Sequence, residues 1–324
     1  MDHCLGEYMM SDTQKKILIA DSIASVGVKK LKRFCKIDCD YSITSSALVE
    51  NIREYNGLIV RSRTKVTEEL IERGSQLEVI GRCGVGVDNI DIEACRKNGV
   101  LVVNSPLASS IAVGELTIGL MLSLARRMPF CDKEVKSGNW PKSTVRGYEL
   151  NGKTLGLKAI GRIGAEVARL ANAFGMRVIG YDPYISDERF LELNVNVVGY
   201  EELLMESDYI SLHAPLTDET KNMINVDTIN LMKHGVRIIC AARGGLIDEE
   251  ALYQYIESGK IAGAGLDVFE KEPPGFSKLV GHPNVVVSPH IGAQTVEAQD
   301  RAGIDVANEV IAALKGESLR WRIV

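Results

Sequence analysis

Short apolar runs alternate with amphipathic stretches along most of the chain, and this alternation limits the fold more than any other feature. The first predicted strands are 16–20 (KILIA), 57–60 (GLIV), 77–82 (LEVIGR) and 100–103 (VLVV). Amphipathic segments between them, such as 67–73 and 91–97, predict helices. Strands and helices that alternate in this way form a parallel sheet with helices on both faces. The sequence therefore predicts an α/β protein.

A second series of predicted strands follows the turn-rich segment 137–153. Its members are TLGLK (154–158), MRVIGYD (176–182), DYISLH (208–213), VRIICAA (236–242), AGAGLDV (262–268) and NVVVSPH (284–290). Since domains commonly contain about 100–200 residues, we expect the 324 residues to form two α/β domains. Between the two series, segment 109–127 is apolar on nearly all sides and predicts a long helix. This helix is expected either in the core of its own domain or at an interface.

Composition excludes several classes of protein. The formal net charge of −5 gives no electrostatic surface for nucleic acid or an anionic membrane, and no apolar run is long enough to span a bilayer. The N-terminal segment 1–16 is polar and acidic, so we expect a frayed tail and no signal peptide. An odd number of scattered cysteines indicates reduced thiols, a cytoplasmic protein and no zinc site. They are Cys4, Cys35, Cys39, Cys83, Cys95, Cys131 and Cys240.

Residues 154–170 (TLGLKAIGRIGAEVARL) contain an incomplete dinucleotide-binding turn between a predicted strand and a predicted helix. In the pattern G-x-G-x-x-G, Gly161 lets the backbone approach a pyrophosphate and Gly164 lets the helix pack on the strand. The free N–H groups of the helix N-terminus favour phosphate. Asp182 lies at the tip of the next strand, where its carboxylate would bind the ribose hydroxyls and repel a 2′-phosphate. The segment therefore predicts a site for NAD in preference to NADP.

Two residues depart from this pattern. Ala159 replaces the first glycine, and its methyl group costs little if φ is negative but of order 1 kcal/mol if φ is positive. Lys158 is a charged residue at the end of a strand that is expected to be buried. We expect its ammonium group to extend outward past the strand end. Both changes predict a cofactor site that is present but weakened.

Polar residues follow three of the later predicted strands, where parallel sheets place active sites. Transfer of a hydride between a nicotinamide and a 2-hydroxy acid requires a cation for the carboxylate and carbonyl, and a forked guanidinium such as that of Arg243 suits it. His290 is suited to general acid–base catalysis on the hydroxyl proton. Glu272 would orient that imidazole. Each residue alone has a structural alternative: a surface ion pair, a solvated carboxylate or a core histidine.

The chain resembles the D-isomer-specific 2-hydroxyacid dehydrogenases from about Lys16 to its end. The segments that carry the resemblance are LIVRSRTKVT, GRCGVGVDNID, ELNGKTLG, GMRVIGYDPY, RGGLIDEEAL, LDVFEKEPP and PHIGAQTVEAQ. The resemblance implies a Rossmann-type doubly wound parallel sheet in an NAD-binding domain at 105–294. A flavodoxin-like substrate domain would combine 1–104 and 295–324, with a closing helix at 295–315 and catalysis in the cleft. The long helix at 109–127 would belong to the interface of a homodimer.

Residue by residue, the resemblance assigns Arg243, Glu272 and His290 to catalysis. It assigns four residues to the substrate, namely Arg61, Arg82, Gly84 and Arg243. The cofactor would be contacted by Val85, Gly161, Arg162, Ile163, Gly164, Asp182, Ala214, Ala241, Arg243, Asp267, His290, Gly292 and Ala293. Among these, Asp267 would hold the nicotinamide carboxamide. No metal is implied.

Within the family, the branch that oxidises D-3-phosphoglycerate with NAD, in serine synthesis, is the most similar. The alternatives are a hydroxypyruvate or glyoxylate reductase and a nucleotide-binding module related to co-repressors. Departures from the family pattern occur at Leu107–Ser109 and at Cys240, where an Asn is usual. The sequence ends at Val324 without the serine-sensing extension of some relatives. We therefore expect no feedback inhibition through such a domain.

Overall fold

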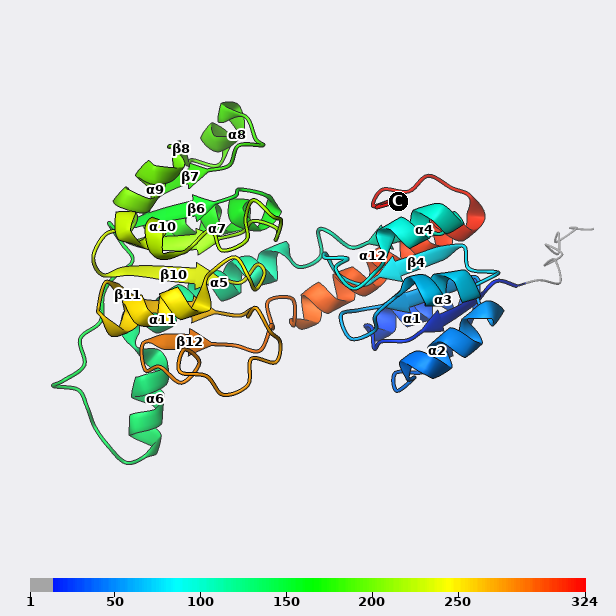
Figure 1. Ribbon diagram of the computed structural model, residues 1–324, viewed down its shortest axis with the longest axis horizontal. Coiled ribbons are helices and arrows are strands. Elements are labelled where there is room, and N and C mark those ends of the chain that lie inside the picture. The colour runs from blue at the N-terminus through cyan, green and yellow to red at the C-terminus, as the bar shows by residue number, and fades with distance from the viewer. Residues whose placement is uncertain (1–13) are drawn as a thin grey trace, which may run out of the picture. The chain divides into compact units, whose positions relative to one another are not determined.

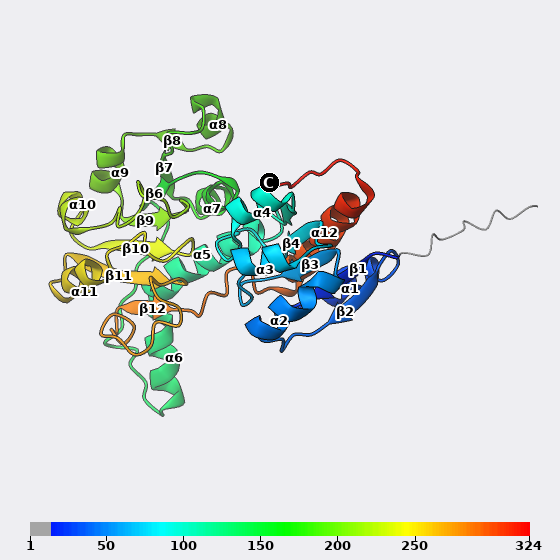
Figure 2. The ribbon, with the colours of Figure 1, turned by 45° about the vertical axis from the view of Figure 1, so that its right-hand side comes forward.

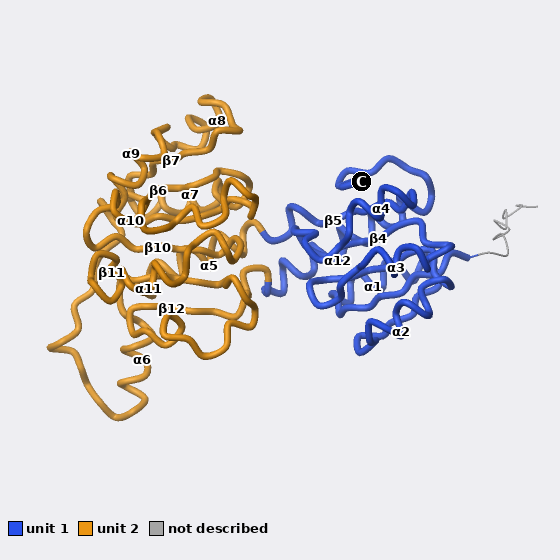
Figure 3. Tube along the Cα trace, in the orientation of Figure 1, with its two compact units in different colours: residues 1–109, 294–324 blue, residues 110–293 orange. Residues whose placement is uncertain are grey.

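The computed structural model describes residues 14–324, and Cys4 and most of the predicted N-terminal tail lie outside the described residues. The chain forms two compact units (Figure 3). Unit 1 combines the segment that ends at Ser109 with the segment Gln294–Val324, and unit 2 is Ser110–Ala293. The sequence-based boundaries were placed near residues 104 and 294. The assignment of the units to substrate and cofactor stays a prediction at this point.

Unit 1 contains a five-stranded parallel sheet in the order β2-β1-β3-β4-β5. The strands are β1 (Lys16–Ile19), β2 (Lys36–Cys39), β3 (Gly57–Val60), β4 (Val79–Arg82) and β5 (Leu101–Asn104). The helices are α1 (Ser25–Leu31), α2 (Ser45–Asn51), α3 (Glu68–Arg73), α4 (Ile92–Asn98) and α12 (Val296–Lys315), with a short 3₁₀ helix at Ile52–Glu54. Leu31 and Val306 pack on one face of the sheet, and Leu48 and Leu70 pack on the other. Helices therefore cover both faces, as the alternation predicts.

Unit 2 contains a seven-stranded parallel sheet in the order β12-β11-β10-β9-β6-β7-β8 (Figure 1). Its strands are β6 (Thr154–Lys158), β7 (Arg177–Tyr181), β8 (Asn196–Val197), β9 (Tyr209–Leu212), β10 (Val236–Cys240), β11 (Ile261–Leu266) and β12 (Val285–Val287). The strand order reverses between β6 and β9, which are neighbours in the sheet. In open α/β sheets such a reversal opens a crevice at the carboxyl ends of the strands, where ligands bind.

Unit 2 contains seven helices in addition to this sheet. They are α5 (Ser110–Arg126), α6 (Met128–Lys136), α7 (Arg162–Ala173), α8 (Asp187–Glu192), α9 (Tyr200–Glu206), α10 (Val226–Leu231) and α11 (Glu249–Glu257). Met121 of α5 and Val167 of α7 share one core cluster, whereas Leu203 of α9 and Leu252 of α11 belong to the cluster on the other face. The doubly wound arrangement predicted from the sequence is confirmed.

The predicted long helix at 109–127 is α5, and one of its faces lies in the core of unit 2. Ile118, Leu120 and Met121 are buried there. In contrast, α6 has no buried residue, and it stands away from the sheet together with the loop that follows it (Figures 1 and 2). The core interpretation of the long helix is therefore confirmed for one face. Among the described residues, no helix is long and apolar enough to cross a membrane.

Candidate active site

The dinucleotide-type turn lies between β6 and α7, beside the point where the strand order reverses. Gly161 is the N-cap of α7 and makes no side-chain capping bond. A Cβ atom on Gly161 would meet no atom within 4 Å, so the packing of the protein does not require glycine there. A Cβ atom on Gly164 would lie 2.6 Å from the carbonyl oxygen of Ala159, so close packing does require that glycine. The open space and the exposed helix N-terminus fit a pyrophosphate group.

Asp182 lies directly after β7, at the tip predicted for a ribose-binding carboxylate. Its Oδ2 accepts a hydrogen bond of 2.8 Å from the N–H of Ile160, and its Oδ1 accepts one of 3.0 Å from the N–H of Tyr184. These bonds tie the acidic tip to the glycine turn. A carboxylate oxygen has two lone pairs, so each oxygen keeps capacity for a ribose hydroxyl. The residues at this edge therefore fit an adenine dinucleotide.

Ala159 adopts a φ of 66°, in the left-handed region that favours glycine. At a positive φ, an alanine in place of glycine costs stability of order 1 kcal/mol. Strain is therefore present in the turn that would hold the cofactor.

The prediction that Lys158 extends past the strand end is wrong. The side chain is 9% exposed, and its Nζ lies 4.6 Å from the ring centroid of Tyr181 and 5.6 Å from that of Tyr200. Burial lowers the pKa of Lys158, and the negative charges of Asp182 and Glu219 oppose this shift. The two aromatic faces attract the ammonium group and favour its buried position.

His213, after β9, is a partly buried group of this edge that the sequence interpretation missed. Its Nε2 lies 3.0 Å from Ser211 Oγ, and its Nδ1 is buried without a hydrogen-bond partner among the described residues. Burial lowers the pKa of His213 to about 4. The imidazole is therefore neutral at pH 7.

On the other side of β9, His290 and Glu272 form the pair predicted from the sequence. The Nδ1 of His290 lies 2.7 Å from Oε2 of Glu272, and Oε1 of Glu272 accepts a 3.2 Å bond from the N–H of Phe269. The side chain of His290 is about half exposed. A carboxylate at Nδ1 fixes the tautomer that carries its proton there. In this tautomer the Nε2 atom is a hydrogen-bond acceptor.

Asp267, at the carboxyl end of β11, organises the segment that carries His290. The carboxylate is fully buried and accepts hydrogen bonds from the hydroxyl of Ser288 (2.6 Å) and from the N–H groups of Ile291 and Gly292 (2.8 Å each). The carbonyl of Asp267 also accepts a 2.8 Å bond from the N–H of His290. Asp267 therefore fixes the backbone on both sides of the candidate acid–base residue. Its role toward a nicotinamide carboxamide stays a prediction.

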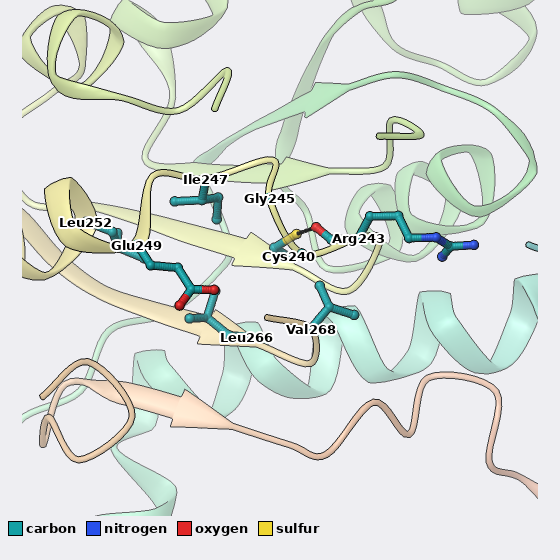
Figure 4. Close-up of a pocket in the computed structure, with 9 residues that line it drawn as sticks. Cys240, Arg243, Gly245, Ile247, Glu249, Leu252, Leu266 and Val268 are labelled. Carbon is teal, nitrogen blue, oxygen red and sulfur yellow. Dashed lines mark hydrogen bonds between the residues drawn. The ribbon is translucent and has the colours of Figure 1, made fainter. Parts of the chain in front are cut away.

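Arg243 lies in the loop between β10 and α11, and Figure 4 shows its side chain directed away from a small cavity behind that loop. The thiol of Cys240 donates a hydrogen bond of 3.5 Å to the carbonyl of Arg243 (Figure 4). Burial raises the pKa of Cys240 to about 11, so the thiol keeps the proton that it donates. Cys240 thus supports the loop where the family pattern has Asn.

Ala214 is the second residue after β9, and Ala241 is the first residue after β10. Both lie at the same edge of the sheet. Gly292 donates one of the hydrogen bonds that Asp267 accepts, and Ala293 is the next residue. The structure thus places these predicted cofactor residues, with Asp182 and the glycine turn, at the carboxyl ends of strands in one unit. Val85 belongs to the other unit.

In unit 1, the predicted substrate residues Arg61 and Arg82 lie at the carboxyl ends of two neighbouring strands. Arg61 directly follows β3, and Arg82 is the last residue of β4, where it pairs with Val60. The guanidinium of Arg82 lies against Gly84, where a Cβ atom would be 1.5 Å from Nη1 and φ is 144°. Gly84 therefore has a steric reason to be glycine.

The buried carboxylate of Asp21 shapes the loop that Arg61 begins, and the sequence interpretation did not include it. Oδ2 of Asp21 accepts a 2.6 Å bond from the N–H of Arg61, and its Oδ1 accepts 2.8 Å bonds from Nε of Arg63 and the hydroxyl of Thr64. Asn89 donates to the carbonyls of Arg61 and Thr64 at 2.8 and 2.6 Å. An acidic residue directly after a buried strand was the available signal for Asp21.

The parallel sheet of unit 2, with a glycine turn at its switch point and a histidine–carboxylate pair along the same edge, defines a dinucleotide-dependent dehydrogenase architecture. The sequence comparison gives the particular family. Residues 118–292 match the model of the "D-isomer specific 2-hydroxyacid dehydrogenase, NAD binding domain". The chain belongs to this family, and unit 2 contains its NAD-binding domain.

Similar proteins cover nearly the whole chain. It is 47% identical to a D-3-phosphoglycerate dehydrogenase of Methanocaldococcus jannaschii over 93% of this chain and 58% of that protein. It is 44% identical to a D-3-phosphoglycerate dehydrogenase of Synechocystis over 94% of this chain and 55% of that protein. The chain thus spans somewhat more than half the length of these curated relatives. A crystal structure of a glyoxylate reductase from Paecilomyes thermophila superposes with a TM-score of 0.87 at 31% identity, covering 96% of this chain and 98% of that one.

Proposed function

We propose that this chain oxidises D-3-phosphoglycerate to 3-phosphohydroxypyruvate with NAD, the first step of a route to serine. The 2.7 Å contact between His290 and Glu272, on the sheet edge that carries the dinucleotide turn, is the observation on which the proposal depends. The similarity to two D-3-phosphoglycerate dehydrogenases supports the choice of substrate.

The proposed mechanism assigns one task to each side chain. NAD held by the glycine turn and Asp182 would supply the acceptor for the hydride that leaves the substrate carbon. The free Nε2 of His290 takes the hydroxyl proton, because Nδ1 is engaged by Glu272. The carboxylate of Glu272 stabilises the imidazolium that results. The guanidinium of Arg243 grips the substrate carboxylate and polarises its oxygen.

Arg61 and Arg82 are proposed to supply positive charge for the phosphate end of the substrate. Their positions at the ends of two paired strands support this role. Asp21 and Asn89 hold the backbone around Arg61, which reduces the entropy lost when a ligand binds. A phosphorylated substrate requires such fixed cations, whereas lactate or glyoxylate does not.

The test is NADH oxidation with phosphohydroxypyruvate, beside hydroxypyruvate, pyruvate and glyoxylate, by the wild type and an Arg61→Ala variant. We expect the phosphorylated substrate to be used most efficiently, and Arg61→Ala to lower kcat/KM for it by about 10–100-fold, as expected for loss of a charged contact. Arg96→Ala, which removes an exposed arginine on α4, is the control and should change it less than about twofold. Full turnover by Arg61→Ala would refute the phosphate site.

A reductase for small 2-oxo acids is the second candidate. It is favoured by the glyoxylate reductase structure, since the two chains cover each other almost completely. In the same assay this candidate predicts faster turnover of hydroxypyruvate and glyoxylate than of the phosphorylated acid. It also predicts that Arg61→Ala leaves that turnover unchanged.

We also propose a homodimer, located in the cytoplasm. Large apolar side chains on α6 and the loop after it are exposed, among them Met128 (55%), Val135 (49%) and Trp140 (77%). Exposed apolar groups of this size commonly mark protein–protein contacts. The six cysteines among the described residues are free thiols, which supports a reducing compartment. Sedimentation of the wild type and of Trp140→Ser tests the dimer, and a monomeric wild type would contradict it.

A further inference from the structure

One peptide group, between Phe269 and Glu270, joins the loop that carries Arg243 to the loop that carries Glu272. The N–H of Glu270 donates a 2.7 Å hydrogen bond to Oε1 of Glu249. At the opposite end of the peptide, Gly244 lies so close that a Cβ atom there would be 1.8 Å from the carbonyl oxygen of Phe269. The first residue of α11 and the loop after β10 therefore contact this peptide at its two polar ends.

The held peptide is next to the one that contacts the acid–base pair. The N–H of Phe269 donates to Oε1 of Glu272, whose Oε2 bonds His290. Movement of the Phe269–Glu270 peptide would change the direction of the Phe269 N–H group, because the two peptides share the Cα atom of Phe269. A continuous path thus runs from Glu249 to His290 through a single backbone segment.

The position of Glu249 suits a carboxylate that accepts a backbone N–H. It is the first residue of α11, where the partial positive charge of the helix N-terminus favours an anion. Figure 4 shows its side chain beside the cavity behind the Arg243 loop. The neighbouring Glu250 is exposed, and its carboxylate accepts a 3.0 Å bond from the side chain of Gln254.

We propose that Glu249 is a positioning residue of the active site. Its carboxylate fixes the Phe269–Glu270 peptide and thereby sets the orientation of Glu272 toward His290. The position of Glu272 is thus coupled to that of the loop that carries Arg243. The inference rests on the proposed function. It adds a residue that does not touch the reacting atoms and acts through the backbone.

The kinetic test compares four variants. Glu249→Ala removes the acceptor, and Glu249→Asp keeps the charge but is too short to reach Glu270. We expect both to lower kcat about 10–100-fold while KM for NAD changes less than about threefold, because small displacements of catalytic groups reduce rate more than binding. Glu249→Gln keeps an oxygen that accepts the same N–H and should retain kcat within about threefold. Glu250→Ala is the matched control on the adjacent residue and should equal the wild type.

A second measurement does not depend on turnover. The proton that joins His290 Nδ1 to Glu272 should give a far-downfield proton resonance, assigned by its loss in a His290→Asn variant. We expect this resonance to broaden through faster exchange in Glu249→Asp and to persist in Glu249→Gln and Glu250→Ala. Persistence in Glu249→Asp, or a normal kcat in that variant, would overturn the proposal. A wild type that reduces no 2-oxo acid but shows this pattern of resonances would refute the proposed function and leave the positioning role supported.

Discussion

The two halves of the carboxyl edge of the unit 2 sheet differ in how their buried polar groups are satisfied. The half proposed for acid–base chemistry, here the acid–base half, consists of the loops after β10, β11 and β12, where buried Asp267 accepts three hydrogen bonds and Cys240 donates one. The cofactor half consists of the segments after β6, β7 and β9. There Lys158 is buried against aromatic rings, and Nδ1 of His213 is buried without a partner in the described part of the chain.

This difference agrees with the proposed task of each half. Proton transfer needs hydrogen-bond distances between side chains, so the acid–base loops gain from saturated anchors such as Asp267. A dinucleotide is bound through many backbone and side-chain contacts, so a strained turn lowers its affinity without abolishing the site. The cofactor half can therefore contain Ala159 at a φ of 66°. Variants in each half should accordingly respond differently.

The largest effect is expected in the acid–base half, for Asp267→Ala. The change leaves the N–H groups of Ile291 and Gly292 without their acceptor in a buried site. Each such loss costs about 1–3 kcal/mol, so urea denaturation should show a loss of about 3–5 kcal/mol. Ser288→Ala, which removes one of the three bonds, is the control and should cost about 1 kcal/mol. Equal effects of the two variants would mean that Asp267 does not anchor this segment.

In the cofactor half, His213 should make stability depend on pH. Its folded pKa of about 4 lies below the ordinary 6.5, so the unfolded chain binds the proton more strongly between these values. Stability is therefore lost as pH falls below about 6.5, by about 2 kcal/mol between pH 7 and pH 5. Denaturation at both pH values should show that His213→Gln loses less stability than the wild type between pH 7 and pH 5. A variant of an exposed histidine, His234→Gln, should lose as much stability as the wild type. A wild-type stability that is unchanged between pH 7 and pH 5 would contradict the prediction.

Lys158→Leu should change the free energy of unfolding by a smaller amount, and it should increase it. Burial lowers the lysine pKa, so the desolvation of the ammonium outweighs the attraction of Asp182 and Glu219. Replacement of a buried charge by an apolar group of similar size should raise stability by about 1 kcal/mol at pH 7. In the wild type, stability should rise as pH increases toward the ordinary lysine value, and this rise should vanish in the variant. A destabilised Lys158→Leu would show that the contacts with the tyrosine rings outweigh desolvation.

The extent to which the sequence predicted these features depends on how local each feature is. Strands buried on both faces, such as β3 and β10, were predicted because they are apolar throughout. Strand β2 was not predicted, because it is an edge strand with exposed polar residues. The position of His290 after a buried strand was visible in the sequence. The contact of Glu249 with Glu270 was not, because it joins residues 21 positions apart through one backbone N–H.

The smallest effect, Ala159→Gly, tests whether strain alone separates the cofactor half from the acid–base half. Because φ is 66° at Ala159, glycine should stabilise unit 2 by about 0.5–1 kcal/mol and tighten NAD binding several-fold. The matched control is Ala165→Gly in α7, where the same loss of a methyl group should destabilise by about 0.5–1 kcal/mol because the residue is helical. Thermal unfolding and NADH fluorescence titration would measure both quantities. If Ala159→Gly and Ala165→Gly both destabilise, the left-handed φ is not the source of strain, and the buried charge of Lys158 becomes the main difference between the two halves.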